Sequence, residues 1–118
     1  MGLDMYLYEK EVNQVAYWRK ANAIHNWFIT NAEVEDNGTP IHVSRSKLIE
    51  LRDTCTKVLE IQTEDAAQEL LPPVGGFFFG TTEIDDWYWY DVKKTEEALT
   101  VIINQSTEDQ MYEYYASW

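Results

Sequence analysis

Hydrophobic positions at the start of the chain recur at every second residue from Leu3 to Tyr8. Aliphatic side chains alternate there with acidic and aromatic ones, which predicts a β-strand that is covered on one face. From about Val15 the spacing lengthens to that of a helix, and an arc that includes Trp18 predicts a helix over 14–32. Trp27 falls on the side opposite to this arc. The other residues of the arc are Ala21, His25, Phe28, Ile29 and Ala32.

The middle of the chain repeats the two spacings. Residues 33–40 carry acids, a glycine and a proline and predict a loop, and residues 41–43 predict a short strand. A regular helical stripe then predicts a helix over 45–61, with Ser44 or Ser46 as its N-terminal cap. The stripe consists of Leu48, Leu51, Cys55, Val58 and Leu59.

Proline and glycine divide the second half of the chain. Segment 63–71 predicts one or two further helical turns that end before Pro72. Segment 74–80 predicts a short apolar strand between two turns, and the capping pattern that begins at Thr82 predicts a helix over 83–104. The apolar side of this helix contains Ile84, Trp87, Tyr88, Thr95, Ala98, Leu99 and Ile102.

An aromatic strand over 111–118 completes the pattern. The chain of 118 residues shows no internal repeat and no break in composition, so we expect a single domain over 1–118. The order of the elements predicts an α+β fold, a small, largely antiparallel sheet with about three helices packed on one face. We expect the first and last strands to lie close together in this sheet.

The charge of the chain is strongly negative and unevenly placed. Nine Lys and Arg stand against 21 Asp and Glu, a net charge of −12, and the five Trp, eight Tyr and four Phe argue against an acidic disordered chain. Residues 1–59 hold seven cations and eight acids, whereas residues 60–118 hold two cations and thirteen acids. This balance argues against direct nucleic-acid binding and against docking on a membrane, and it favours a partner protein with a basic surface. The alternative is an acidic surface that only keeps the protein in solution.

Cysteine and histidine are too few and too widely spread to form a recognisable metal site. The one cysteine, Cys55, excludes an internal disulfide, and the sequence shows no leader pattern and no apolar span, so we expect a cytoplasmic protein. His25, His42 and Cys55 lie far apart in the sequence, and the acids around Asp85 lack the spacing of a calcium loop. We therefore expect no metal and no cofactor. Cys55 falls within an apolar stripe, which favours a buried and unreactive thiol.

Four polar residues follow one edge of the first predicted helix, beside its apolar arc. They are Arg19, Asn22, His25 and Asn26. Such a strip can line a ligand cleft, in which His25 would transfer protons. The strip can equally anchor the helix, with His25 buried and hydrogen-bonded through one ring nitrogen and the amides bound to loop carbonyls.

A second candidate site lies at the start of the last predicted helix, where acidic residues flank a run of four aromatic residues. Trp87 and Tyr88 are expected to face inward, while Trp89 and Tyr90 project outward beside carboxylates. Exposed Trp and Tyr in acidic surroundings are typical of a protein-binding hot spot. The alternative is that another segment, such as the aromatic last strand, covers them. The expected partner-binding residues are Asp85, Asp86, Trp89, Tyr90, Asp91 and Glu97.

Several blocks of sequence, which together cover most of the chain, carry a resemblance. They are Met1–Leu7, Tyr17–Asn22 with Ile24-His25 and Trp27-Phe28, Leu70–Pro72 with Gly76–Gly80, and Ser117-Trp118. The chain resembles, through these blocks, a family of small uncharacterised bacterial and phage proteins. The resemblance implies a phage or prophage setting and no catalytic residue.

Three functional hypotheses follow. The leading one is a non-enzymatic binding protein, encoded by a phage or prophage, that acts on a host protein through its acidic aromatic half. In one form it inhibits a host nucleic-acid enzyme or defence complex by occupying a basic groove through charge mimicry. The second is a small-molecule-binding domain or small enzyme that uses Arg19, Asn22 and His25. The third is a structural component whose aromatic last strand pairs across a homodimer as an edge strand.

Overall fold

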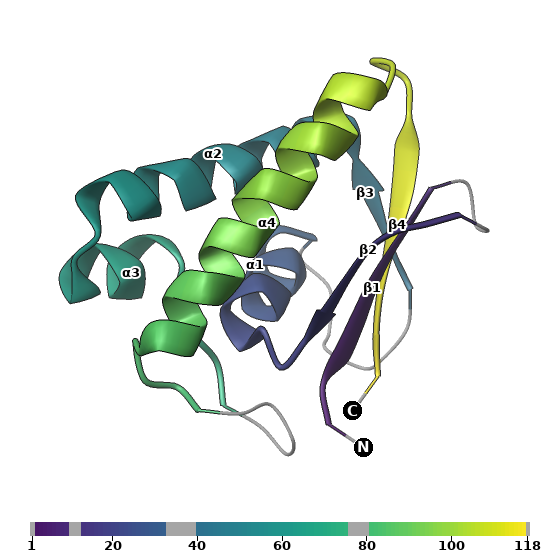
Figure 1. Ribbon diagram of the computed structural model, residues 1–118. Helices are drawn as coiled ribbons and strands as arrows, with labels where there is room; N and C mark the ends of the chain where they lie inside the picture. Colours follow the sequence, from purple (N-terminus) through teal and green to yellow (C-terminus); the bar gives the residue numbers. More distant parts are fainter. Residues whose placement is uncertain (1, 10–12, 33–39, 76–80, 118) are drawn as a thin grey trace.

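The computed structural model describes residues 2–9, 13–32, 40–75 and 81–117. They form two layers, a four-stranded antiparallel sheet and four helices that lie together on one of its faces (Figure 1). The α+β class and the antiparallel sheet are therefore confirmed. The structure has four helices where about three were expected, because the turns predicted over 63–71 form a separate short helix.

The first and last strands are neighbours at the centre of the sheet. Its strands are β1 (Asp4–Glu9), β2 (Asn13–Arg19), β3 (Ile41–Ser44) and β4 (Met111–Ser117), in the order β2-β1-β4-β3. The expected closeness of the terminal strands is thus confirmed, since β1 pairs with β4 along its whole length. β4 pairs with β3 on its other side. It is therefore not an edge strand, and the pairing of β4 across a homodimer was wrong.

The helix predicted over 14–32 was wrong in its first half, which is strand β2. Met5 of β1 pairs with Trp18, and the register shifts at a bulge between Leu7 and Tyr8. The chain leaves β2 at Lys20, whose backbone has a φ of 56° and whose N–H donates to the carbonyl of Leu3 at 2.7 Å. This left-handed residue separates the strand from helix α1, because neither a strand nor a right-handed helix accommodates a positive φ.

Helix α1 runs from Asn22 to Ala32. Trp27, expected on the far side of the helix from the core, is buried. The predicted arc included residues of β2, so it described the direction of α1 incorrectly, and the real buried side takes in both Trp27 and Phe28.

The two following helices agree with their predictions. Helix α2 (Arg45–Ile61) has the expected bounds and is capped by Ser44, whose hydroxyl accepts a hydrogen bond from the N–H of Lys47 at 3.3 Å. Helix α3 (Glu64–Leu70) is capped in the same way by Thr63. The apolar segment predicted as a strand within 74–80 and the loop at 33–40 fall mostly outside the described residues, which exclude 33–39 and 76–80.

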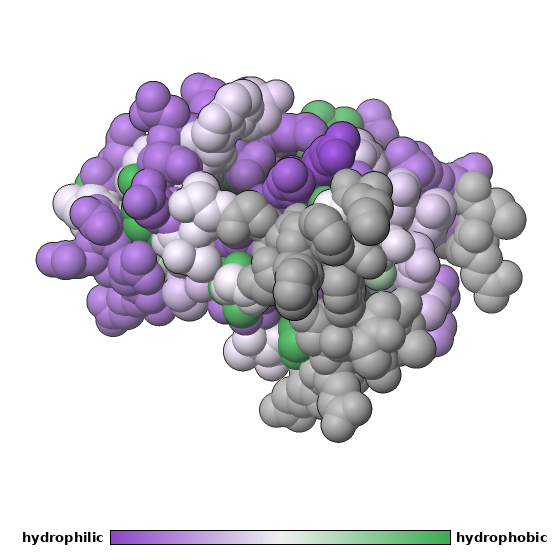
Figure 2. Space-filling view, turned by 90° about the horizontal axis from the view of Figure 1, so that it is seen from below, coloured by the Kyte–Doolittle hydropathy of each residue, from purple (hydrophilic) through white to green (hydrophobic). Residues whose placement is uncertain are grey.

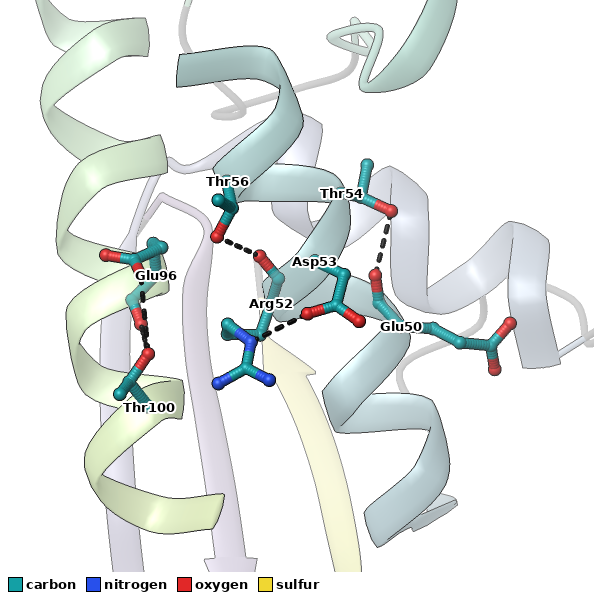
Figure 3. A network of polar contacts seen from close by, with 7 residues as sticks. All are labelled: Glu50, Arg52, Asp53, Thr54, Thr56, Glu96 and Thr100. Carbon is teal, nitrogen blue, oxygen red and sulfur yellow. Dashed lines mark hydrogen bonds and ion pairs between the residues drawn. The ribbon is translucent and has the colours of Figure 1, made fainter. Parts of the chain in front are cut away.

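Helix α4 (Asp86–Gln105) crosses the sheet and packs against α2. Buried aliphatic residues of both helices, with the inward side chains of the strands, form one core. The indole N–H of Trp18 donates to the Thr95 hydroxyl at 2.7 Å inside this core, which ties β2 to α4. On the flank of the two helices, Thr56 and Thr100 donate to carbonyls of the preceding turn of their own helix (Figure 3). These hydroxyl groups therefore form hydrogen bonds within their own helices.

The opposite face of the sheet carries tyrosines and has no helix over it among the described residues (Figure 1). Tyr6 lies across from Tyr17 on β2 and from Tyr115 on β4, with ring centroids 5.3 Å and 6.1 Å away. The Tyr17 hydroxyl donates to Asp4 at 2.6 Å, and this bond raises the pKa of Tyr17. The strand predicted from the alternation between Leu3 and Tyr8 is therefore confirmed, and the helices cover one of its faces.

Candidate functional site

The first turn of α4 determines which of its aromatic residues face solvent. Asp85 is the N-terminal cap, and its carboxylate accepts a hydrogen bond from the N–H of Tyr88 at 3.0 Å. The capping pattern predicted at Thr82 was therefore wrong, and the helix begins three residues later than expected. An aspartate suits this place because it accepts an otherwise unpaired N–H and carries a charge that the helix dipole favours.

The aromatic residues of α4 lie differently from the prediction. Trp87 is 71% exposed and Tyr90 is 57% exposed. Tyr88 is buried, and its hydroxyl donates to the carbonyl of Leu71 at 2.8 Å. Trp89 is partly buried and packs against the core. Trp87 was thus wrongly expected inside and Trp89 wrongly expected outside, whereas Tyr88 and Tyr90 were placed correctly.

The buried stripe of α4 explains this difference. The stripe shares four residues with the predicted one and adds Val92 and Ile103. Its buried residues are Tyr88, Val92, Thr95, Leu99, Ile102 and Ile103. Ile84 lies before the helix and so does not help to define its apolar side. The centre of the observed stripe is rotated from that of the predicted one by roughly 50°, about half the angle between successive residues. Trp87 is thereby moved out of the core and Trp89 to its margin.

Trp87 and Tyr90 form an exposed aromatic pair. Their ring centroids lie 6.1 Å apart with an interplanar angle of 83°, the edge-to-face arrangement that aromatic pairs prefer. Asp86 is exposed beside them, and Glu97 is exposed farther along α4. The pair stands in the most acidic stretch of the chain, because residues 58–92 contain eight acids and no Lys or Arg.

The helical parts of this acidic stretch form one end of the molecule, which we call the acidic end. It comprises the end of α2, helix α3 and the start of α4, which lie at the left and lower left in Figure 1. Figure 2 views the molecule from the side on which α4 begins. The described surface there is mostly hydrophilic, and hydrophobic residues appear in small separate patches.

Asp91 differs from the other carboxylates of the acidic end. It is half-buried, and burial raises its pKa from 3.8 to about 6, with Asp85 adding to the rise and Lys94 opposing it. Asp85, Trp87 and Asp91 line one small cavity of about 40 Å³ together with Asn22 of α1. The structure therefore brings together residues from both sequence-predicted sites, in a space of about one or two water molecules.

The polar edge of the first predicted helix does not form a cleft. His25 is 1% exposed, and its Nδ1 lies 2.6 Å from the hydroxyl of Tyr114 in the core. Arg19 lies on β2, outside α1, with its Nε 3.9 Å from Asp4. Proton transfer by His25 to a bound substrate is thus contradicted by its burial, and the four residues do not converge.

The two asparagines of this edge anchor the helix to the loop that precedes α4. Asn22 donates to the carbonyl of Thr81 at 2.8 Å and accepts from the N–H of Val74 at 3.3 Å, so it holds both ends of the glycine-containing segment. Asn26 donates to the carbonyl of Pro72 at 3.1 Å. The anchoring alternative is therefore the correct one for these amides.

The remaining candidates, Cys55 and His42, lie on different elements. Cys55 is buried in the α2 stripe, where burial raises the pKa of its thiol to about 12. His42 is exposed on β3. Within residues 2–9, 13–32, 40–75 and 81–117 no group of three or more His, Cys, Asp or Glu side chains is arranged to hold a metal ion.

Two signals in the sequence could have located the exposed pair more sharply. Residues 58–92, between Lys57 and Lys93, contain no Lys or Arg, so counting charges between successive cations identifies this acid-rich stretch directly. Counting charges in each half of the chain does not define its limits. If Val92 and Ile103 are included in the apolar stripe of α4, the sequence predicts an exposed position for Trp87.

Comparison with known proteins adds no functional information. No family model, no curated protein and no solved structure matches the chain. Among the helices of the described residues, none has the length and apolar character needed to cross a membrane.

Proposed function

We propose that the protein is a non-enzymatic binding domain that docks on a basic protein surface through its acidic end. The observation that carries the proposal is the exposed pair of Trp87 and Tyr90 in a stretch without Lys or Arg. Large aromatic side chains supply contact area with little loss of conformational freedom, which is why they dominate binding hot spots. The surrounding carboxylates would orient and accelerate the approach of a cationic partner.

The partner-binding residues in this proposal are those of the start of α4, with Trp87 in the place first given to Trp89. Asp85, Asp86 and Asp91 lie beside the aromatic pair. In the phage or prophage setting that the resemblance implies, the partner would be a host nucleic-acid enzyme or defence complex whose basic groove the acidic end occupies. Guanidinium and ammonium groups of such a groove would meet both carboxylates and aromatic faces.

The test is capture of partners on the immobilised full chain from a bacterial lysate, at low and at high salt. We expect captured proteins with basic surfaces, identified by mass spectrometry, and a steep loss of capture as salt is raised. Replacing Trp87 and Tyr90 together by alanine should reduce capture about tenfold or more. Val101→Ala is the matched control, because Val101 is 54% exposed on the same helix and lies away from the acidic end.

A second variant separates charge from shape. Replacing Asp85, Asp86 and Asp91 together by asparagine removes three carboxylates. Asparagine is also a good helix N-cap, so α4 should still begin at the same residue. Capture that survives both sets of substitutions, or that does not respond to salt, would overturn the proposal.

A further inference from the structure

Strand β2 is the longer of the two outer strands of the sheet. It runs for seven residues from Asn13 to Arg19, whereas β3, the outer strand on the other side, has four. β2 pairs with β1 on one side, and the sheet order places no described strand on the other. An outer strand of this length presents backbone groups that can pair with another extended chain, so it is a place where molecules can associate.

One contact shows how the backbone of β2 is directed. The carbonyl of Tyr17 accepts a hydrogen bond from Nζ of Lys94 at 3.2 Å, so this carbonyl points away from β1. Residues of an antiparallel pair alternate between exchanging both backbone hydrogen bonds with the opposite residue and exchanging none. Tyr17 and Tyr6 form a pair of the second kind, so the N–H of Tyr17 also points to the outer side. The bond from Lys20 to Leu3 agrees with this alternation, because it lies three residues farther along the strand.

The packing of α4 on β2 determines the position of Lys94. The indole N–H of Trp18 donates to the hydroxyl of Thr95 at 2.7 Å in the core. Trp18 follows Tyr17 in β2 and Thr95 follows Lys94 in α4, so this bond holds the two contacting residues beside each other. Lys94 itself is exposed, and its ammonium group reaches the outer edge of the sheet from the helix layer. A buried hydrogen bond thus positions an exposed cation.

All the groups in this arrangement belong to the described part of the chain. Residues 10–12 join Glu9 to Asn13, which lie opposite each other in the sheet. Tyr17 is four residues, roughly 13 Å, farther along β2. A backbone of three residues with both ends held by this pair extends about 8 Å at most, so it cannot pair with β2 at Tyr17. Residues 33–39 join α1 to β3, which is three strand spacings, roughly 14 Å, from β2.

The sequence of β2 gives this strand little protection against pairing. It contains no Asp, Glu or Pro, and its one charged residue is Arg19 at its end. The net charge of −12 repels two copies of the chain at long range, but physiological salt screens such repulsion beyond about 8 Å. Natural sheets commonly place a lysine at an exposed edge, where it prevents pairing. In this protein the lysine comes from the neighbouring helix.

We propose that Lys94 prevents β2 from pairing with β2 of a second copy of the chain. Two copies would pair antiparallel about a two-fold axis, with the outward backbone groups of one Tyr17 opposite those of the other. The ammonium group of Lys94 occupies the carbonyl that this pairing needs. The symmetric arrangement would also bring the two Lys94 ammonium groups together, and like charges at short distance repel each other.

The test measures association of the full chain with Lys94→Met, which keeps a long unbranched side chain and removes the ammonium group. Light scattering and analytical ultracentrifugation over a range of concentrations give the association constant. We expect it to rise about tenfold or more above that of the natural protein. Loss of one cation takes the net charge from −12 to −13, so general charge repulsion predicts the opposite result.

Two further variants and one local measurement locate the effect. Lys93→Met is the matched control, because Lys93 is exposed on the same helix, carries the same charge and forms no hydrogen bond with the described residues of β2. Lys94→Arg keeps a cation with N–H donors and should associate as weakly as the natural protein. In the associated Lys94→Met variant, amide hydrogen exchange should slow at Tyr17.

Four results would contradict the proposal. An unchanged association constant for Lys94→Met would show that the ammonium group does not control pairing, and equal association of Lys93→Met would assign the effect to surface charge. Association that leaves exchange at Tyr17 unchanged would place the interface elsewhere. A natural protein that already associates through Tyr17 as strongly as the variant would show that Lys94 is no barrier. If circular dichroism shows that Lys94→Met does not fold, Lys94→Gln takes its place with the same expected results.

Discussion

Replacing Asp91 by asparagine should make the protein more stable at neutral pH and leave it nearly unchanged in acid. Burial raises the pKa of Asp91 from 3.8 to about 6, so the folded protein holds this proton more tightly than the unfolded chain does. Below both values Asp91 is neutral in both states. As the pH rises from about 4 to about 6, the unfolded chain releases the proton first, and the folded state loses relative stability. Asparagine has no proton to lose.

The size of the effect follows from the shift. A change from 3.8 to about 6 corresponds to at most roughly 3 kcal/mol of unfolding free energy. Asp91 is only half-buried, and solvent screens its charge, so we expect about 1–2 kcal/mol. Above about pH 7 the variant should exceed the natural protein in stability by this amount. Below about pH 4 the two should agree within about 0.5 kcal/mol.

Urea unfolding followed by tryptophan fluorescence measures this difference across the pH range. Glu97→Gln serves as control, because it removes one negative charge from an exposed position of the same helix. A difference between Asp91→Asn and the natural protein that stays constant with pH would refute the reasoning. A variant that is less stable at neutral pH would also refute it, since that result would mean that Lys94 stabilises the charged form more than burial destabilises it.

Three further predictions concern buried side chains. Asn22→Ala removes the side-chain bonds to Val74 and Thr81 and should lower the unfolding free energy by about 1–3 kcal/mol in urea titrations, whereas a loss below about 0.5 kcal/mol would mean that these bonds are dispensable. Tyr114→Phe removes the hydroxyl 2.6 Å from His25 inside the core and should cost about 1–3 kcal/mol by the same measurement, with an unchanged fold by circular dichroism. Cys55 should react with a thiol reagent such as DTNB only as the protein unfolds, because it is fully buried and its pKa is raised to about 12. Labelling of the folded protein at the rate of an exposed thiol would contradict this.

Local signals sufficed for α2 but not for the boundary between β2 and α1. Helix α2 has a capping serine and a complete apolar stripe, and both signals lie within the segment or directly before it. The turn at Lys20 has a positive φ without a glycine to mark it. Trp18 suits both a strand and a helical arc, and its pairing with Met5 depends on a different part of the chain.

The candidate sites were predictable in composition but not in orientation. The acidic and aromatic character of the start of α4 is plain from the sequence, whereas the exposure of Trp87 depends on how α4 rotates against the core. His25 forms a hydrogen bond with Tyr114, which lies far along the chain, so the sequence offered the burial of His25 only as one of two alternatives. A cavity of about 530 Å³ is lined by residues of α1, α2, β3 and β4, and no local pattern in the sequence predicts a cavity made from segments so far apart.

The central place of β4 has a consequence for the order in which the protein is made. β4 is the last of the four strands to be synthesised, yet it lies between β1 and β3. Until residues 111–117 are available, β1 has a partner only in β2, and β3 has no strand beside it. A nascent chain at this stage exposes two strand edges that the finished sheet closes, and exposed edges promote association between chains. The sheet therefore cannot form until β4 has been synthesised, and the sequence distance between β1 and β4 favours slow folding.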